Sequence, residues 1–215
     1  MIALVDYGLG NIQAFANIYK RLNIPVVVAG TVGQLAAAER IILPGVGAFD
    51  WAMARLQESG MRDCLDDLVL NKKRPVLGVC VGMQMMACRS DEGKMAGLGW
   101  IEGEVKKLGG GEDEKVRGAE DERLNGRKLS LPHMGWNDVT PTDPGGFFNG
   151  ISAARFYFLH SYYFAPASPD AILAMTDYNG PFASAVRVGN VYGTQFHPEK
   201  SHQWGIQLLK NFANL

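Results

Sequence analysis

Apolar and polar positions follow two alternating patterns in the first hundred residues. Short apolar runs have the length of buried strands, and they lie at about 1–5, 25–29, 40–43 and 75–79. Segments with apolar residues at helical spacing lie between and after them, at about 10–22, 48–59 and 61–71. Strands that alternate with helices predict an α/β fold, with an open and mostly parallel sheet flanked by helices.

The pattern changes after residue 100 to short segments of alternating polarity. Four of them, at 155–159, 171–176, 182–187 and 190–196, are predicted to add antiparallel strands, and a last helix is expected at about 201–213. A chain of 215 residues with 47% hydrophobic content can bury one sizeable core. We therefore expect a single domain over residues 1–215.

One segment does not fit that core. Residues 108–128 are rich in glycine and in charges of both signs, with few apolar positions. Such a composition predicts a flexible surface insertion. A solvated loop without a function of its own is the simpler interpretation, and a regulatory element is the alternative.

Charge and cysteine content exclude several classes of protein. The formal net charge of −1 gives no electrostatic reason to expect a nucleic acid or a membrane surface as partner. The apolar runs are too short to span a bilayer, and no signal peptide is visible. Three cysteines without paired spacing argue against a disulfide framework. These features predict a cytoplasmic protein.

Cys80 lies in the segment Gly78-Val79-Cys80-Val81-Gly82, between an apolar run and a helical pattern. Small residues on both sides are what a nucleophile needs at a sharp turn from strand to helix. With a strand up to Val79 and a helix over 81–89, the unpaired N–H groups at the start of that helix would favour a thiolate. The alternative is a small buried cysteine without chemistry. We assign that structural role to Cys64 and Cys88, which lie in helical patterns without flanking glycines.

A second candidate segment ends a strand at Gln195-Phe196-His197-Pro198-Glu199. Pro198 disfavours the helical region for His197, and residues two apart in an extended segment point the same way. His197 and Glu199 can therefore face one site. A cysteine nucleophile needs a base and a third group that orients the base. His197 and Glu199 are our candidates for these roles.

The other histidines are weighed as rivals. His202 could form a metal cluster with His197 and Glu199, but Pro198 separates them by a change of secondary structure, which makes a zinc site a weak hypothesis. His133 and His160 lie among aromatic residues, where a hydrogen-bonded structural histidine is the commoner outcome. Either remains a candidate for lining a cleft, and we expect no metal site.

A third segment runs from an apolar strand into the turn Gly45-Val46-Gly47. Glycines free backbone N–H groups to point at a ligand, and such donors stabilise the oxyanion of acyl transfer. An ordinary strand-to-helix turn would explain the same residues. Beside a cysteine nucleophile, we assign Gly45, Val46 and Gly47, together with the N–H of Val81, to an oxyanion hole.

Together, several motifs resemble the class I (triad) glutamine amidotransferases over nearly the whole chain. The motifs are Asp-Tyr-Gly-Leu-Gly-Asn at 6–11, Pro-Gly-Val-Gly at 44–47, Gly-Val-Cys-Val-Gly-Met-Gln at 78–84, Pro-His-Met-Gly-Trp-Asn at 132–137, His-Ser-Tyr-Tyr at 160–163 and Gln-Phe-His-Pro-Glu-Lys-Ser at 195–201. The cysteine turn and His-Pro-Glu are common to the family. The first and fourth motifs are more specific and resemble the glutaminase subunits of imidazole glycerol phosphate synthase.

The resemblance implies a role for each residue already singled out. Cys80 would attack the side-chain amide of glutamine, His197 would protonate the departing ammonia, and Glu199 would orient His197. Residues that match the family's glutamine pocket are Gln84, Glu92, Ser161 and Tyr162. No cofactor is implied.

The resemblance also implies a protein partner. In the family's histidine-pathway members, ammonia passes to a (β/α)8-barrel cyclase subunit, which uses it to convert the ribonucleotide PRFAR into imidazole glycerol phosphate and AICAR. Positions that match the interface of this heterodimer are Asn11, Met134, Gly135, Trp136 and Tyr157. An interface of this type is rich in aromatic residues. The glutaminase is expected to be nearly silent until the partner binds.

Two alternatives stay open. Histidine-pathway members usually carry a small polar residue near position 14, where this chain has Ala14, so a related pair that supplies ammonia for amidination of a surface sugar remains an alternative. Peptidase-like, chaperone-like or inactive members of the fold are a further class. They would not need Gln84 or the Pro-His-Met-Gly-Trp-Asn segment, and an inactive module would be free to lose the triad.

Overall fold

The structure is a computed structural model that describes residues 1–109 and 130–215. The insertion predicted at 108–128 lies outside these residues, apart from 108 and 109.

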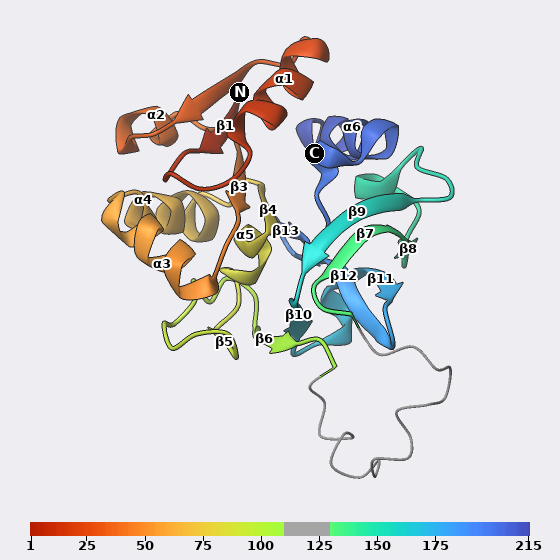
Figure 1. Cartoon of the computed structure of the whole chain (residues 1–215). Coiled ribbons are helices and arrows are strands. Elements are labelled where there is room, and N and C mark those ends of the chain that lie inside the picture. Colours follow the sequence, from red (N-terminus) through yellow and green to blue (C-terminus); the bar gives the residue numbers. More distant parts are fainter. Residues whose placement is uncertain (110–129) are drawn as a thin grey trace.

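The centre of the protein is one mixed sheet of eight strands (Figure 1). Its spatial order is β2 (Val26–Ala29), β1 (Ile2–Val5), β3 (Arg40–Gly45), β4 (Val76–Cys80), β13 (Val191–Thr194), β12 (Pro181–Val188), β11 (Ile172–Asp177) and β8 (Thr140–Pro141). The pairs from β2 to β13 are parallel, and those from β13 to β8 are antiparallel. The predicted parallel core with added antiparallel strands is confirmed.

Strand β13 departs from the expectation in one respect. It pairs antiparallel with β12 through a tight hairpin, but it pairs parallel with β4 on its other side. All four of its residues are buried, since both faces of the sheet are covered at this point. It therefore joins the parallel core and places the segment that follows it beside the end of β4.

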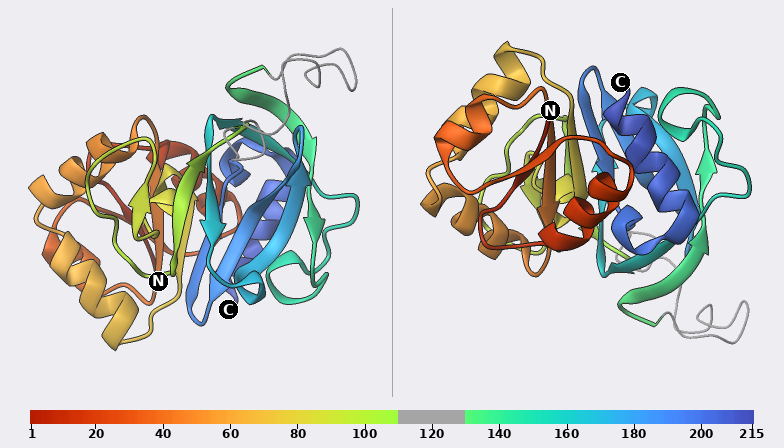
Figure 2. Two further views of the ribbon diagram at one scale, coloured as in Figure 1. Left: turned by 90° about the horizontal axis from the view of Figure 1, so that it is seen from below. Right: turned by 90° about the horizontal axis from the view of Figure 1, so that it is seen from above.

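Helices lie on both sides of the sheet. They are α1 (Ile12–Arg21), α2 (Val32–Ala36), α3 (Phe49–Glu58), α4 (Arg62–Asp66), α5 (Val81–Gln84) and α6 (His202–Ala213), with a π turn at Asp67–Asn71 and 3-10 turns at Gly146–Phe148, Pro169–Ala171 and Pro198–Lys200. Helix α1 packs beside α6, while α2 contacts α4 and α3 contacts α5. Figure 2 shows the pair α1 and α6 apart from the group that contains α3 and α4.

Two small sheets complete the C-terminal half. One contains β10 (Tyr162–Pro166), β6 (Gly103–Lys107) and β5 (Arg89–Ser90), and the other pairs β7 (His133–Asp138) with β9 (Arg155–His160). Strand β7 contacts β11, so the β7–β9 ribbon lies over the antiparallel part of the large sheet (Figure 1).

The buried apolar side chains of the described residues join in one cluster. The ring of Phe156 stacks on Phe196 at 4.0 Å between centroids, which connects the ribbon to the end of β13. The Tyr19 hydroxyl donates to the carbonyl of Leu209 at 3.1 Å and connects α1 to α6. Across the described part of the chain, no helix combines the length and apolar character that crossing a membrane would require.

Three neighbouring strands end at the same edge of the sheet. Gly45 at the end of β3 pairs with Cys80 at the end of β4, and Val79 pairs with Thr194 at the end of β13. Ligands of open α/β sheets bind at such carboxyl ends. The fold thus brings together the three segments that were predicted to form the active site, which contain Gly45, Cys80 and His197.

Candidate active site

Cys80 occupies a strained turn between β4 and α5. Its φ is 55° and its ψ is −114°, which are angles that a residue with a side chain rarely adopts. The glycines around it permit close packing: a Cβ on Gly82 would lie 1.9 Å from the Leu43 carbonyl oxygen, and one on Gly78 would lie 2.6 Å from the Gly82 oxygen. The predicted nucleophile elbow is present as a backbone geometry.

The helix after Cys80 is shorter than predicted. We expected it to run over 81–89, but α5 ends at Gln84, and Cys88 lies in an exposed bend. The carbonyls of Met85 and Ala87 accept from Leu98 at 2.7 Å and Gly99 at 3.1 Å, so a later loop takes the acceptors that a continuing helix needs. Four residues carry only a small dipole, so activation of the sulfur depends more on its side-chain neighbours.

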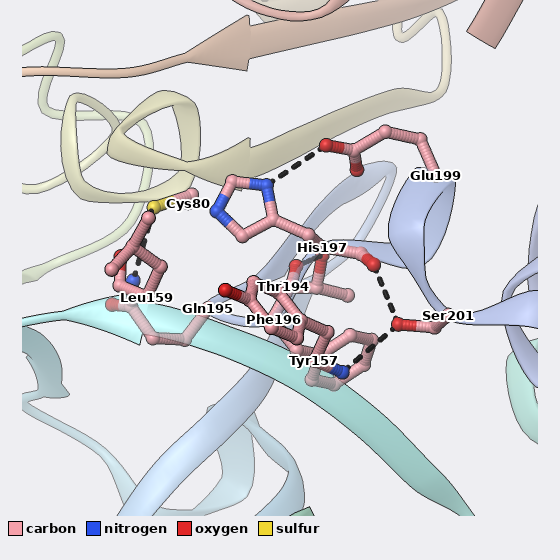
Figure 3. A network of polar contacts seen from close by, with 9 residues as sticks. All are labelled: Cys80, Tyr157, Leu159, Thr194, Gln195, Phe196, His197, Glu199 and Ser201. Carbon is pink, nitrogen blue, oxygen red and sulfur yellow. Dashed lines mark hydrogen bonds and ion pairs between the residues drawn. The ribbon is translucent and has the colours of Figure 1, made fainter. Parts of the chain in front are cut away.

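His197 and Glu199 meet as predicted. The His197 Nδ1 atom lies 2.9 Å from Glu199 Oε1, and the two side chains are only 5% and 2% exposed. The backbone of His197 is extended, with φ −100° and ψ 93°, as expected for a residue before proline. Figure 3 shows the imidazole between its two neighbours, with one ring nitrogen facing the carboxylate of Glu199 and the other facing the Cys80 sulfur.

The environment of His197 favours the imidazolium form. Burial by itself lowers the pKa of His197, but the neighbouring Cys80 and Glu199, as hydrogen-bond partners and as negative charges, raise the pKa to about 10. A protonated imidazole beside a sulfur stabilises the thiolate. It also holds a proton that can be given to a leaving group.

A cavity of about 300 Å³ opens in front of Cys80 and His197. Its lining contains seven of the other predicted residues, which are Val46, Gly47, Val81, Gln84, Glu92, Ser161 and Tyr162. Pro132, Leu159, His160 and Lys200 complete the lining. A cavity of this volume suits a small polar metabolite.

The three residues of the predicted oxyanion turn occupy different positions. Val46 and Gly47 line the cavity, and Gly47 has a φ of +84°. Gly45 does not line it: a Cβ there would lie 2.3 Å from the Gly82 nitrogen, so this glycine permits β3 to pack against the elbow. Among the predicted backbone donors, Val46, Gly47 and Val81 are thus the ones beside the cavity.

Gln84 and Glu92 are held by protein groups as well as facing the cavity. Gln84 is buried, and its Nε2 donates to the Tyr162 carbonyl at 2.9 Å. Glu92 Oε2 accepts from the backbone N–H of Phe49 at 2.9 Å. The protein thus fixes both side chains.

The three rival histidines have other environments. His133 Nδ1 lies 2.9 Å from His160 Nε2, and both rings are buried among aromatic residues, as predicted. His160 also lines the cavity. The His202 ring stacks on Trp136 at 5.2 Å and 7°, and within residues 1–109 and 130–215 no cluster of metal-ligating side chains forms.

The predicted interface residues lie outside the cavity. Met134 and Trp136 on β7 are 66% and 37% exposed, and Tyr157 lies opposite Trp136 on β9. Gly135 lies between the two exposed side chains with a φ of +128°. Asn11 is exposed at the start of α1.

Three contacts of the candidate site were not predicted from the sequence. Gln195 is fully buried, and its Nε2 lies 3.7 Å from the Cys80 sulfur. The carbonyl of Leu159 lies 3.8 Å from the same sulfur. Ser201 Oγ donates to the His197 carbonyl at 2.6 Å (Figure 3). Gln195 and Ser201 lie within four residues of His197, and the signal that the sequence offered for Gln195 was a polar residue at the end of a predicted strand.

A larger hollow of about 400 Å³ lies elsewhere, between β5, β6 and the end of β10. Its polar lining is made of Arg89, Glu102, Glu104 and Lys106, and three of these side chains are engaged in ion pairs with one another. It contains none of the predicted site residues.

Comparison with known proteins defines the class of this chain. The sequence profile of the family "Glutamine amidotransferase class-I" matches residues 3–214. A solved structure titled "Crystal structure of glutamine amidotransferase" superposes with a TM-score of 0.72 at 18% identity, covering 100% of this chain and 99% of that one. The chain belongs to the class I glutamine amidotransferase family, and its fold is that of the family.

More similar relatives are named at the level of a subunit. "Imidazole glycerol phosphate synthase subunit HisH" from Bdellovibrio bacteriovorus is 57% identical, with 100% of both chains covered. The proteins of the same name from Leptospira interrogans and Leptospira borgpetersenii are 48% and 46% identical, again over 100% of both chains.

Proposed function

We propose that this chain is the glutaminase subunit of an imidazole glycerol phosphate synthase, with Cys80, His197 and Glu199 as its catalytic triad. The observation that carries the proposal is that Cys80 and His197, with Glu199 bound to His197, lie at a cavity that Gln84, Glu92, Ser161 and Tyr162 also line. The full-length similarity to subunits named HisH supports the choice of synthase.

The geometry supports a thioester mechanism. The Cys80 thiolate attacks the side-chain carbonyl of glutamine, and the oxyanion that forms is stabilised by backbone N–H groups of Val46, Gly47 and Val81. His197, held protonated by Glu199, gives its proton to the departing ammonia. Water, deprotonated by His197, then hydrolyses the thioester and releases glutamate.

The ends of the substrate have matching groups. The carboxylate of Glu92 is the group in the cavity that suits the ammonium of glutamine. Ser161, between β9 and β10, and Tyr162, the first residue of β10, also line the cavity. In this proposal the side-chain amide lies beside Cys80.

The ammonia is used by a partner subunit. We propose a (β/α)8-barrel cyclase that docks on the exposed Met134 and Trp136 and the half-buried Tyr157, with Asn11 and Gly135 at the same interface. A surface that presents Trp, Tyr and Met side chains together is typical of a protein interface. The cyclase would use the ammonia to convert PRFAR into imidazole glycerol phosphate and AICAR in histidine biosynthesis.

The first experiment measures release of glutamate from glutamine. The purified chain would be assayed alone, with a histidine-pathway cyclase subunit, and with that subunit plus PRFAR. We expect strong stimulation in the last case. Folded protein without stimulation would contradict the histidine-pathway partner.

Substitution of the nucleophile tests the chemistry separately. Cys80→Ala should abolish hydrolysis while binding of the cyclase subunit stays unchanged. Cys88→Ala, in an exposed bend, is the matched control and should keep full activity. Retained hydrolysis in Cys80→Ala would refute the assignment of the nucleophile.

One observation favours a different use of the ammonia. Ala14 stands in the first turn of α1 where histidine-pathway members usually carry a small polar residue, so ammonia supply for amidination of a surface sugar is the alternative. Both functions share the glutaminase chemistry. Stimulation by PRFAR with the cyclase subunit distinguishes them.

A further inference from the structure

A buried row of amide groups connects the Cys80 sulfur to strand β10. Gln195, fully buried at the end of β13, has its Nε2 3.7 Å from Cys80 Sγ and its Oε1 3.0 Å from Gln84 Nε2. Gln84 Nε2 also lies 2.9 Å from the Tyr162 carbonyl oxygen. Figure 3 shows Gln195 beneath the sulfur, on the side away from Glu199.

The Tyr162 carbonyl determines the orientation of the side-chain amides of Gln84 and Gln195. A carbonyl oxygen can only accept, so the Gln84 group that faces Tyr162 must be its NH2. The second hydrogen of that NH2 goes to the neighbouring Gln195, which must therefore present its oxygen to Gln84. Gln195 is left with its NH2 directed at the sulfur.

The Tyr162 carbonyl also contacts His160, which in turn contacts His133. His160 Nδ1 lies 2.9 Å from the Tyr162 oxygen and must carry a hydrogen, so His160 Nε2 accepts from His133 Nδ1 at 2.9 Å. Asn137 Nδ2 then donates to His133 Nε2 at 3.2 Å. Burial lowers the pKa of His133 to about 4 and that of His160 to about 3, so both rings stay neutral at pH 7, as this order of donors requires.

We propose that Gln195 is a further catalytic residue, whose side-chain N–H donates to the Cys80 sulfur and favours the thiolate, and that Gln84 and the Tyr162 carbonyl are what aim it. The Leu159 carbonyl, 3.8 Å from the sulfur, can only accept and so favours the protonated thiol. Gln195 is therefore a neutral donor that adds to the effect of His197. The proposal rests on the proposed function because the sulfur must be the nucleophile.

The same assignment of donors and acceptors shows which atom of the Gln84 amide is free to bind a ligand. Both hydrogens of its NH2 are used by Tyr162 and Gln195, so what Gln84 can offer to the cavity is its oxygen. It would accept a hydrogen bond from the substrate.

The test follows the rate of Cys80 alkylation by iodoacetamide as a function of pH. The chain has two other cysteines, so the Cys80 peptide is followed by mass spectrometry. Gln195→Met keeps the length of the side chain and removes the donor. We expect the pH midpoint of alkylation to rise by about one unit, with a roughly tenfold slower reaction at pH 7, because a hydrogen bond to a charged group is lost.

Thr194→Val is the matched control. Thr194 precedes Gln195 and is equally buried, but its hydroxyl donates to the Phe196 carbonyl at 3.2 Å and not to the sulfur. Its midpoint should equal that of the wild type. An unchanged midpoint in a folded Gln195→Met protein would overturn the proposal.

A second variant covers the case in which Gln195→Met does not fold. Gln84→Met leaves Gln195 in place but removes the group that aims it, and it should raise the midpoint in the same direction. If Gln195→Met is unfolded, Gln84→Met decides alone, and an unchanged midpoint in it overturns the proposal. If both variants fold, unchanged midpoints in both overturn it. Alkylation needs neither glutamine nor the cyclase subunit. Absence of glutamine hydrolysis with a normal Gln195 effect would therefore count against the proposed function alone.

Discussion

The hydroxyl of Ser201 donates to the carbonyl of His197 at 2.6 Å, and it accepts from the backbone N–H of Tyr157 at 3.0 Å. His197 N–H in turn donates to the Tyr157 carbonyl at 2.9 Å. One buried side chain thus connects the backbone of the proposed base to β9, which also carries part of the proposed partner surface.

Ser201→Ala removes both contacts and leaves a buried N–H without its partner. We expect a loss of about 1–3 kcal/mol in the free energy of unfolding, and a lower kcat because His197 is less well positioned. Urea unfolding and the stimulated glutaminase assay measure the two effects. Ser59→Ala, at the end of α3, likewise removes two hydroxyl contacts, with the Leu56 carbonyl and the Met61 N–H, and should keep full kcat. An unchanged kcat in Ser201→Ala would contradict the positioning role.

Gly82→Ala should destabilise the elbow by about 1–3 kcal/mol. The added Cβ would lie 1.9 Å from the Leu43 carbonyl oxygen, and backbone cannot move aside as a flexible side chain can. Gly33→Ala in α2 is the control, because no atom lies within 4 Å of its added Cβ. It should be neutral or slightly stabilising. Chemical denaturation of both variants compares them, and equal stabilities would refute the packing argument.

The raised pKa of His197 predicts how stability depends on pH. In the folded protein its pKa is about 10, against an ordinary value of 6.5, so the protonated imidazole contributes stability that is lost as pH rises from 6.5 to 10. Below pH 6.5 the stabilisation is fully present.

Glu199→Gln removes one cause of that shift. Between pH 6.5 and 10 its free energy of unfolding should fall less steeply than that of the wild type. Denaturant titrations at several pH values in this window test the expectation. Parallel curves for the two proteins would show that Glu199 does not hold the His197 proton.

Trp136→Ala should weaken binding of the cyclase subunit by about 30-fold or more, as expected for an aromatic hot spot worth about 2 kcal/mol. Trp136 is part of a stack with His202 and contacts the rings of Tyr157 and Trp204, so it is a fixed element of the surface. Titration calorimetry measures the affinity. Trp51→Ala, 55% exposed on α3, should bind like the wild type, and equal loss in both variants would place the interface elsewhere.

Local rules were enough to predict most strands of the large sheet, the longer helices and the three segments that carry the candidate site, but they did not predict α2, β6, β7 or β10. Gly78 and Gly82 around Cys80 predicted a sharp turn, and Pro198 predicted an extended His197 with Glu199 on the same side. Each depends on steric limits within a few residues. The motifs around them supplied the resemblance to the amidotransferase family, which the comparison confirmed.

Long-range hydrogen bonds decided what local rules could not. The helix predicted over 81–89 stops at Gln84 because the loop at 97–101 takes its carbonyls. Strand β13, predicted as an added antiparallel strand, also pairs parallel with β4, which is distant in the sequence.

The sequence by itself determined which residues can do chemistry and which backbone turns can carry them, because those properties depend on side-chain type and near neighbours. Only the tertiary structure decided that Gln195 faces the Cys80 sulfur, that Ser201 holds the His197 backbone, and that His202 stacks on Trp136. These contacts join residues from different elements. Their geometry depends on how the whole sheet and its helices pack.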